Sequence, residues 1–163
     1  MKSNRKKKAI IIPATWLIAA VFIIYLAGVF YITLFAWNYG SSYGPVGPGG
    51  RNYNLEPFLS IYRIAVYSPD MTGPLRILAG NVLLFVPFGI LFPYLVKRIL
   101  GTHSMLIGLV TVFTAMLMSV MIEIYQFVFT YRVANVDDVI LNTLGGLTGY
   151  IIYRFSRLIK LIS

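Results

Sequence analysis

The sequence contains no cysteine and only one histidine, His103, among its 163 residues. The absence of cysteine excludes structural disulfides, thiol catalysis and zinc sites that use cysteine ligands. A histidine-based metal centre is excluded in the same way, so any bound metal would need oxygen ligands. Acidic residues are also scarce, and three of the five lie between residues 123 and 138. We therefore predict no resident cofactor and no metal, and we look for function around this acidic group.

Charge is sparse along the whole chain. Charged residues make up 12% of it and hydrophobic residues 58%, with a mean hydropathy of +0.78. This composition is typical of a polytopic membrane protein rather than a soluble domain. The net charge of +9 comes from residues spread over tails and loops beside apolar runs, without a basic helix or an RNA-binding motif. We expect membrane lipids, and not nucleic acid, as partners.

Four apolar runs predict an all-α integral membrane protein with a single domain over residues 1–163. The expected transmembrane helices are residues 10–37, 77–96, 104–130 and 137–153. A basic stub before an apolar run is also typical of a signal peptide. The first run is longer than a signal-peptide core and lacks a clear cleavage site, so we interpret it as a retained helix. Pro87 and Pro93 should kink or loosen the second.

Residues 38–76 separate the first two predicted spans and differ from both. Glycine, proline, serine and tyrosine dominate their first part, which predicts an irregular extracellular loop. After Pro57, the segment FLSIYRIAVYS places apolar residues at helical spacing but is too short to cross a bilayer. Two interpretations remain: a helix lying in the membrane interface, or a partly buried loop.

Basic residues collect in three segments that predict the orientation. These segments are the N-terminal stub, the Lys97-Arg98 loop and the C-terminal tail. All three fall on one side of the membrane if the chain crosses four times, and the positive-inside rule makes that side the cytoplasm. We therefore expect a multi-pass protein of the cell membrane with both termini cytoplasmic. The acidic group and the long loop then lie at the outer face.

Polar side chains near this outer face follow a helical pattern. Glu123 and Gln126 are three residues apart on one helix, and Asn135, Asp138 and Asn142 continue the stripe into the next. The stripe ends at Gly145 and Gly149, whose spacing allows another helix to approach closely. Carboxylates and amides in this arrangement can bind a hard cation, accept protons or hold a polar head group.

Several of these residues also have simple structural interpretations. We expect Asp137 to cap the N-terminus of its own helix, where the helix dipole favours a carboxylate. Arg132 can form an ion pair with a nearby acid or contact a ligand. Asn81 either caps the second helix or hydrogen-bonds into the polar group. Glu123 is expected to have a partner, because an ionisable group at the end of an apolar helix is costly.

Four motifs, in this order and spacing, resemble the VanZ-like family. They are NLEPF at residues 54–58, NVLLFVPFG at 81–89, EIYQF at 123–127 and DVILNTLGG at 138–146. The resemblance implies a small multi-span membrane protein linked to resistance against the glycopeptide antibiotic teicoplanin. Many relatives carry an acid where this chain has Asn135, which argues against a full carboxylate cage. The candidate ligand-binding or functional residues are Asn54, Asn81, Glu123, Gln126, Arg132, Asp138 and Asn142.

Three functional hypotheses follow. The first is a protective factor at the outer membrane surface that binds a glycopeptide antibiotic or a lipid-linked cell-wall precursor. The second is a membrane enzyme that modifies a lipid or wall-precursor head group, with Glu123 or Asp138 as general base. No nucleophile motif supports the second hypothesis. The third is a structural scaffold whose polar stripe holds the helices together.

Overall fold

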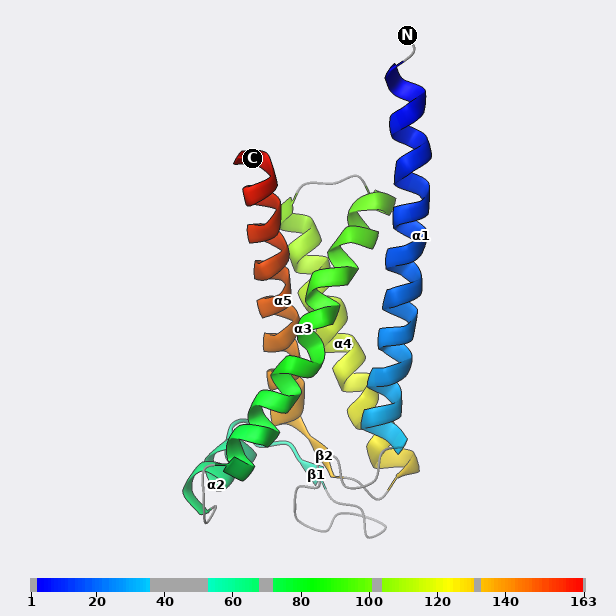
Figure 1. Cartoon of the computed structure of the whole chain (residues 1–163). Coiled ribbons are helices and arrows are strands. Elements are labelled where there is room, and N and C mark those ends of the chain that lie inside the picture. Colours follow the sequence, from blue (N-terminus) through cyan, green and yellow to red (C-terminus); the bar gives the residue numbers. More distant parts are fainter. Residues whose placement is uncertain (1–2, 36–52, 68–71, 101–103, 131–132, 163) are drawn as a thin grey trace.

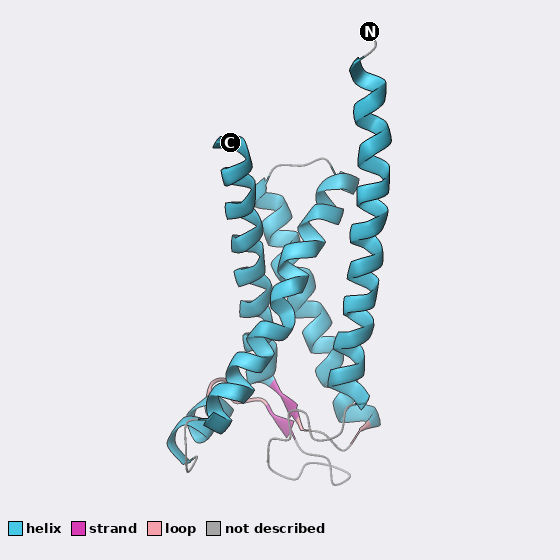
Figure 2. Cartoon of the chain, in the orientation of Figure 1, coloured by secondary structure: helices cyan, strands magenta, loops and turns pink. Residues whose placement is uncertain are grey.

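The computed structural model describes residues 3–35, 53–67, 72–100, 104–130 and 133–162 of the chain. Figure 2 shows that helices dominate these residues and that two short strands lie at one end of the molecule. The expected predominance of α-helices is confirmed. The elements, in chain order, are α1 (Ser3–Phe30), the π-helical η1 (Tyr31–Phe35), β1 (Tyr53–Asn54), α2 (Leu59–Tyr67), α3 (Thr72–Leu100), α4 (Ser104–Phe129), β2 (Ala134–Asn135) and α5 (Val136–Ile162).

Three helices in the described part of the chain are long and apolar enough to cross a membrane. Their candidate spans are Thr15–Phe35, Leu75–Arg98 and Met105–Phe129, which match the first three predicted spans. The fourth predicted span falls in α5, which is long but less apolar because glycines, threonines and Asn142 interrupt its aliphatic residues. The three apolar helices support a membrane protein, while crossing by α5 stays a prediction.

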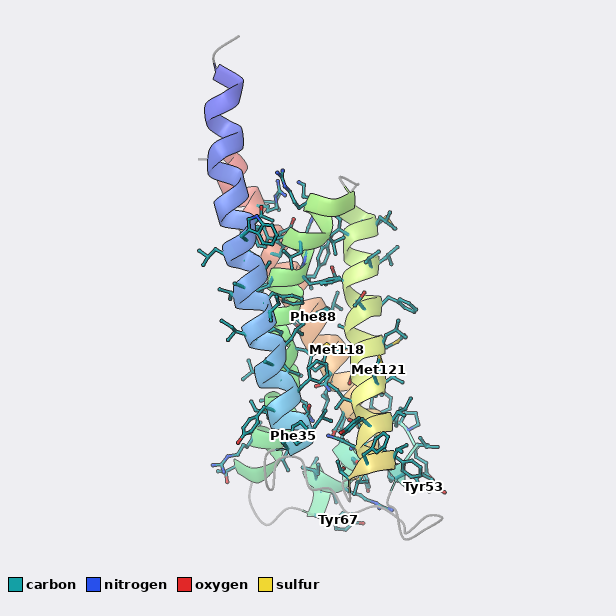
Figure 3. All side chains as sticks on the ribbon, turned by 90° about the vertical axis from the view of Figure 1, so that its right-hand side faces the viewer. Phe35, Tyr53, Tyr67, Phe88, Met118 and Met121 are labelled. Atoms are coloured by element: carbon teal, nitrogen blue, oxygen red, sulfur yellow. The ribbon has the colours of Figure 1, made fainter. Side chains whose placement is uncertain are left out.

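Helix α3 contacts α1, α4 and α5 and crosses the bundle diagonally (Figure 1). It continues through Pro87 and Pro93 from Thr72 to Leu100. Aromatic rings join it to α1: the Phe22 ring centroid lies 5.6 Å from that of Phe88 and 5.9 Å from that of Phe92 (Figure 3). The Tyr25 hydroxyl adds a hydrogen bond by donating to the Leu84 carbonyl at 2.7 Å.

Glycines allow the backbones of α3 and α5 to touch. A Cβ atom on Gly145 would overlap the Val82 carbonyl oxygen, and one on Gly149 would overlap the Val86 carbonyl oxygen. Gly89 of α3 faces the same seam, where a Cβ would overlap the Gly146 carbonyl oxygen. The expectation that Gly145 and Gly149 admit a close helix is confirmed, and that helix is α3.

The segment before α3 is more ordered than the expected loop. Residues 36–52, which include the start of the predicted loop, lie outside the described residues. Beyond them, β1 pairs in parallel with β2, with Tyr53 opposite Ala134 and Asn54 opposite Asn135. The segment after Pro57 forms helix α2, so the partly-buried-loop interpretation is wrong. None of its side chains is fully buried, and it lies beside the start of α3 (Figure 1).

Candidate functional site

The strand pair brings two asparagines into contact at one end of the bundle. The Asn54 side chain donates from Nδ2 to Asn135 Oδ1 at 3.0 Å and to Ser60 Oγ at 2.9 Å. Its Oδ1 accepts the backbone N–H of Glu56 at 3.1 Å, which closes a tight turn before Pro57. The predicted residue Asn54 is therefore buried, and it attaches the loop to the start of α5.

Asn135 lies at the centre of the network. Its Oδ1 accepts hydrogen bonds from Asn54, from Ser60 Oγ at 3.2 Å and from the Asp137 backbone N–H at 3.1 Å. The last bond makes Asn135 the N-cap of α5. Its Nδ2 donates to Asp138 Oδ1 at 3.3 Å. The Asn135 amide can donate to the Asp138 carboxyl group, whereas a carboxylate at this position would be a second acceptor facing it.

Asp137 caps a different helix from the one expected. Its carboxylate accepts the backbone N–H groups of Phe58, Ser60 and Ile61, at 2.5, 2.8 and 3.2 Å. These amides belong to the first turn of α2, so the prediction that Asp137 caps its own helix is wrong. The side chain is 1% exposed. Phe58 has a φ of 66°, a strained conformation for an aromatic residue. The hydrogen bond from its backbone N–H to the Asp137 carboxylate helps to hold this conformation.

Glu123 and Gln126 are both buried but contact different partners. Glu123 Oε2 accepts the backbone N–H of Asn135 at 2.7 Å, which links α4 to β2. Gln126 Nε2 donates to the Thr33 carbonyl oxygen at 2.8 Å, in the π-helical turn η1. A helical segment with irregular hydrogen bonding accommodates such an outside donor. The two side chains share a helix face, as predicted, and connect it to separate elements.

Asn81 and Asp138 connect α3 to α5. Asn81 lies inside α3 and therefore does not cap it. Its Nδ2 donates to Asp138 Oδ1 at 3.0 Å. Of the two interpretations of Asn81, the structure supports the hydrogen bond into the polar group. Asp138 thus accepts side-chain amide donors from Asn135, the N-cap residue in β2, and from Asn81 of α3.

Asn142 lies one helical turn beyond Asp138, within the interface between α4 and α5. Its Nδ2 donates to Ser119 Oγ at 2.8 Å. Its Oδ1 is buried and has no hydrogen-bond partner among the described residues. Buried polar atoms are rarely left unpaired, because the loss of hydration typically costs about 1–3 kcal/mol. This atom is therefore a candidate contact for a ligand.

The structure brings six of the seven predicted candidate residues together in the part of the bundle near the strands β1 and β2. The seventh, Arg132, lies outside the described residues, as does His103. Sequence reasoning missed Ser60 and the roles of Asn135 and Asp137. The N-x-D spacing of residues 135–137 is typical of an Asx turn and could have identified the α5 cap. Within the described ranges, no three histidine, cysteine, aspartate or glutamate residues are grouped as metal ligands.

Two comparisons with known proteins find relatives of this chain. The family model described as VanZ/LLP1 matches residues 22–159. The curated Protein VanZ of Enterococcus faecium is 33% identical over 108 residues, which cover 66% of this chain and 55% of that protein. The chain thus matches about half the length of this curated relative. No solved structure matches. Because the family model covers most of the chain, including every motif of the polar network, the protein belongs to the VanZ/LLP1 family.

Proposed function

We propose that the protein protects the cell envelope against a teicoplanin-type glycopeptide. It acts through a polar site at the outer face of the cell membrane. The observation that carries the proposal is the convergence of all four motifs of the VanZ-like resemblance. Asn54, Asn81, Glu123 and Asp138 come from different motifs, yet each hydrogen-bonds to Asn135 or to a direct partner of Asn135. A network built from residues that far apart in sequence is expected where a function is located.

The distribution of charge supports an outward site. The start of α1, the basic last turn of α3 with Lys97 and Arg98, and the end of α5 lie at the end of the bundle opposite the strands (Figure 1). Basic ends favour the cytoplasmic side. The network, with Glu123, Asp137 and Asp138, then faces outward, where a glycopeptide acts.

The chemistry of the network favours binding over catalysis. The polar atoms of Asn54 and Asn135 are engaged with one another, and Glu123 accepts a backbone amide. Such mutual bonding fixes these buried side chains in place and leaves Asn142 Oδ1, between α4 and α5, as a buried acceptor without a partner among the described residues. Glycopeptides and wall precursors both carry amide and hydroxyl donors. An enzyme that modifies a head group stays the alternative, with Glu123 or Asp138 as general base.

The test compares teicoplanin and vancomycin susceptibility of a sensitive Gram-positive host expressing the wild type, Asp138→Asn or Asn142→Leu. Membrane levels of each variant are quantified in parallel. We expect the wild type to raise the inhibitory concentration of teicoplanin, and both variants to lose this effect at equal abundance. Asn142→Leu also leaves the buried Ser119 hydroxyl without its Asn142 donor, so folding stability should fall by about 1–3 kcal/mol, and protection is compared at matched membrane levels.

A control variant, Leu109→Ala, changes an exposed apolar residue of α4 distant from the network and should protect as the wild type does. Full protection by both network variants would make the network a structural element and would contradict the proposal. Loss of protein from the membrane in both variants would support the scaffold hypothesis instead. An enzyme would show a modified lipid or wall precursor in wild-type cells, and this product would be absent with Asp138→Asn.

A further inference from the structure

A groove of about 560 Å³ opens on the side of the bundle between α4, the strand pair and the start of α5. Its volume lies in the range of small-ligand sites. The lining is almost entirely apolar, and the polar network touches it only through its inner wall. The residues that define it are Tyr53 of β1, Val120, Glu123 and Ile124 of α4, Asn135 of β2 and Val139 of α5.

The groove borders a helix that is long and apolar enough to cross a membrane. Its α4 wall, residues 120–127, belongs to the candidate span Met105–Phe129. Ile124 on this wall is 57% exposed, so the groove opens to the side, away from the core of the bundle. Tyr53 stands beside the end of α4, where its ring meets Phe127 edge-on with centroids 6.2 Å apart (Figure 3). With α4 across the bilayer, lipid chains reach this side of the groove.

The inner wall distinguishes the groove from an ordinary lipid-facing surface. Glu123 and Asn135 line it although both are buried and belong to the hydrogen-bonded network. Bilayer chains are as apolar as leucine, so apolar contact alone does not hold a lipid in one place. Shape, close packing and polar atoms at one end can do so. The groove has a defined shape, and Glu123 and Asn135 stand in its inner wall.

We propose that the groove binds one acyl chain of a membrane phospholipid, with the chain along Val120 and Ile124 and the polar end toward the strand pair. A phospholipid is the occupant that the surroundings favour, because it supplies an extended chain and a polar linkage at this depth. The proposal requires only that α4 spans the bilayer. It is therefore independent of the proposed function in antibiotic protection.

The experiment uses the full chain reconstituted into nanodiscs with a phosphatidylcholine that carries a photoreactive diazirine in one acyl chain. Adducts are mapped by mass spectrometry after illumination. We expect them to concentrate on residues 120–127 and 134–139. In Ile124→Trp, whose indole fills the groove, adducts on residues 134–139 should be lost. Leu109→Trp is the matched control, since Leu109 is an α4 residue with a similar exposure of 60% but lies outside the groove.

Two results would overturn the proposal. In the first, adducts spread evenly over the exposed faces of α4 and α5, with the same pattern in both tryptophan variants. In the second, the groove is labelled by a diazirine-tagged lipoglycopeptide and not by the phospholipid, which would assign it to the antibiotic. Because the readout is made on purified protein, it stands whether or not the protein raises teicoplanin tolerance. A failure of the susceptibility experiment is thus distinguishable from a failure here.

Discussion

Asp137 fastens α2 to the start of α5 at the strand end of the bundle. Its carboxylate accepts three amides from a segment up to 79 residues away, and these bonds cap the first turn of α2. Asp137→Asn keeps the shape but replaces one acceptor oxygen with a donor that faces these amides. We expect this variant to lose about 1–3 kcal/mol of folding stability, because buried backbone donors are left unpaired.

Thermal unfolding of the detergent-purified chain measures this loss, and tryptic cleavage at the exposed Arg63 of α2 reports local release. The control is Thr148→Val, which removes an exposed hydroxyl bonded within its own helix and should change stability by less than about 0.5 kcal/mol. An Asp137→Asn chain that melts and resists trypsin like the wild type would show that the cap is dispensable.

At the scale of elements, the seam between α3 and α5 depends on the absence of side chains. Gly149→Ala places a Cβ against the Val86 carbonyl and the Gly89 backbone, and backbone cannot swing away as a flexible side chain can. We expect this variant to lose about 1–3 kcal/mol of folding stability, which is the usual effect of overpacking. Gly28→Ala in α1 is the matched control, because no atom lies within 4 Å of the position that its Cβ would take.

The folding stability of the Gly28→Ala control should stay unchanged or rise by up to about 1 kcal/mol, since alanine is a better helix former than glycine. Both variants are compared by thermal unfolding followed by circular dichroism. Equal melting of the two would mean that α5 shifts along α3 without loss, and that the close approach contributes little to stability.

The elements also show what the sequence could and could not predict. Apolar runs placed all the long helices, and the glycine spacing predicted the close approach of α5. The two-residue strands were missed, because they are too short to show periodicity and their register depends on partners 81 residues apart. Asp137 was misassigned for a related reason. Capping rules consider only the helix in which a residue lies. The tertiary fold instead brings the start of α2 against the Asp137 carboxylate.

For the whole molecule, most of the described charges are separated along the bundle axis, with Arg63 of α2 and Arg76 near the start of α3 as basic residues at the strand end. The described acids of the network lie at the strand end, and the basic residues Lys97, Arg98, Arg154 and Arg157 lie in the last turns of α3 and in the second half of α5. The sequence predicted this separation because the positive-inside rule needs only the order of apolar and basic segments. The crossing by α5 that the sequence predicts stays a prediction, since α5 is the least apolar of the long helices.

Cysteine labelling decides both orientation and crossing, because the chain has no cysteine of its own. Glu56→Cys places a thiol in the exposed turn after β1, and Ser156→Cys places one near the far end of α5. With four crossings, a membrane-impermeant maleimide should label Glu56→Cys in intact cells and Ser156→Cys only after permeabilisation. The reverse pattern would put the polar network in the cytoplasm, where an extracellular glycopeptide does not reach it. Labelling of both from outside would mean that α5 does not cross, and the basic residues at its end would then need a reason other than orientation.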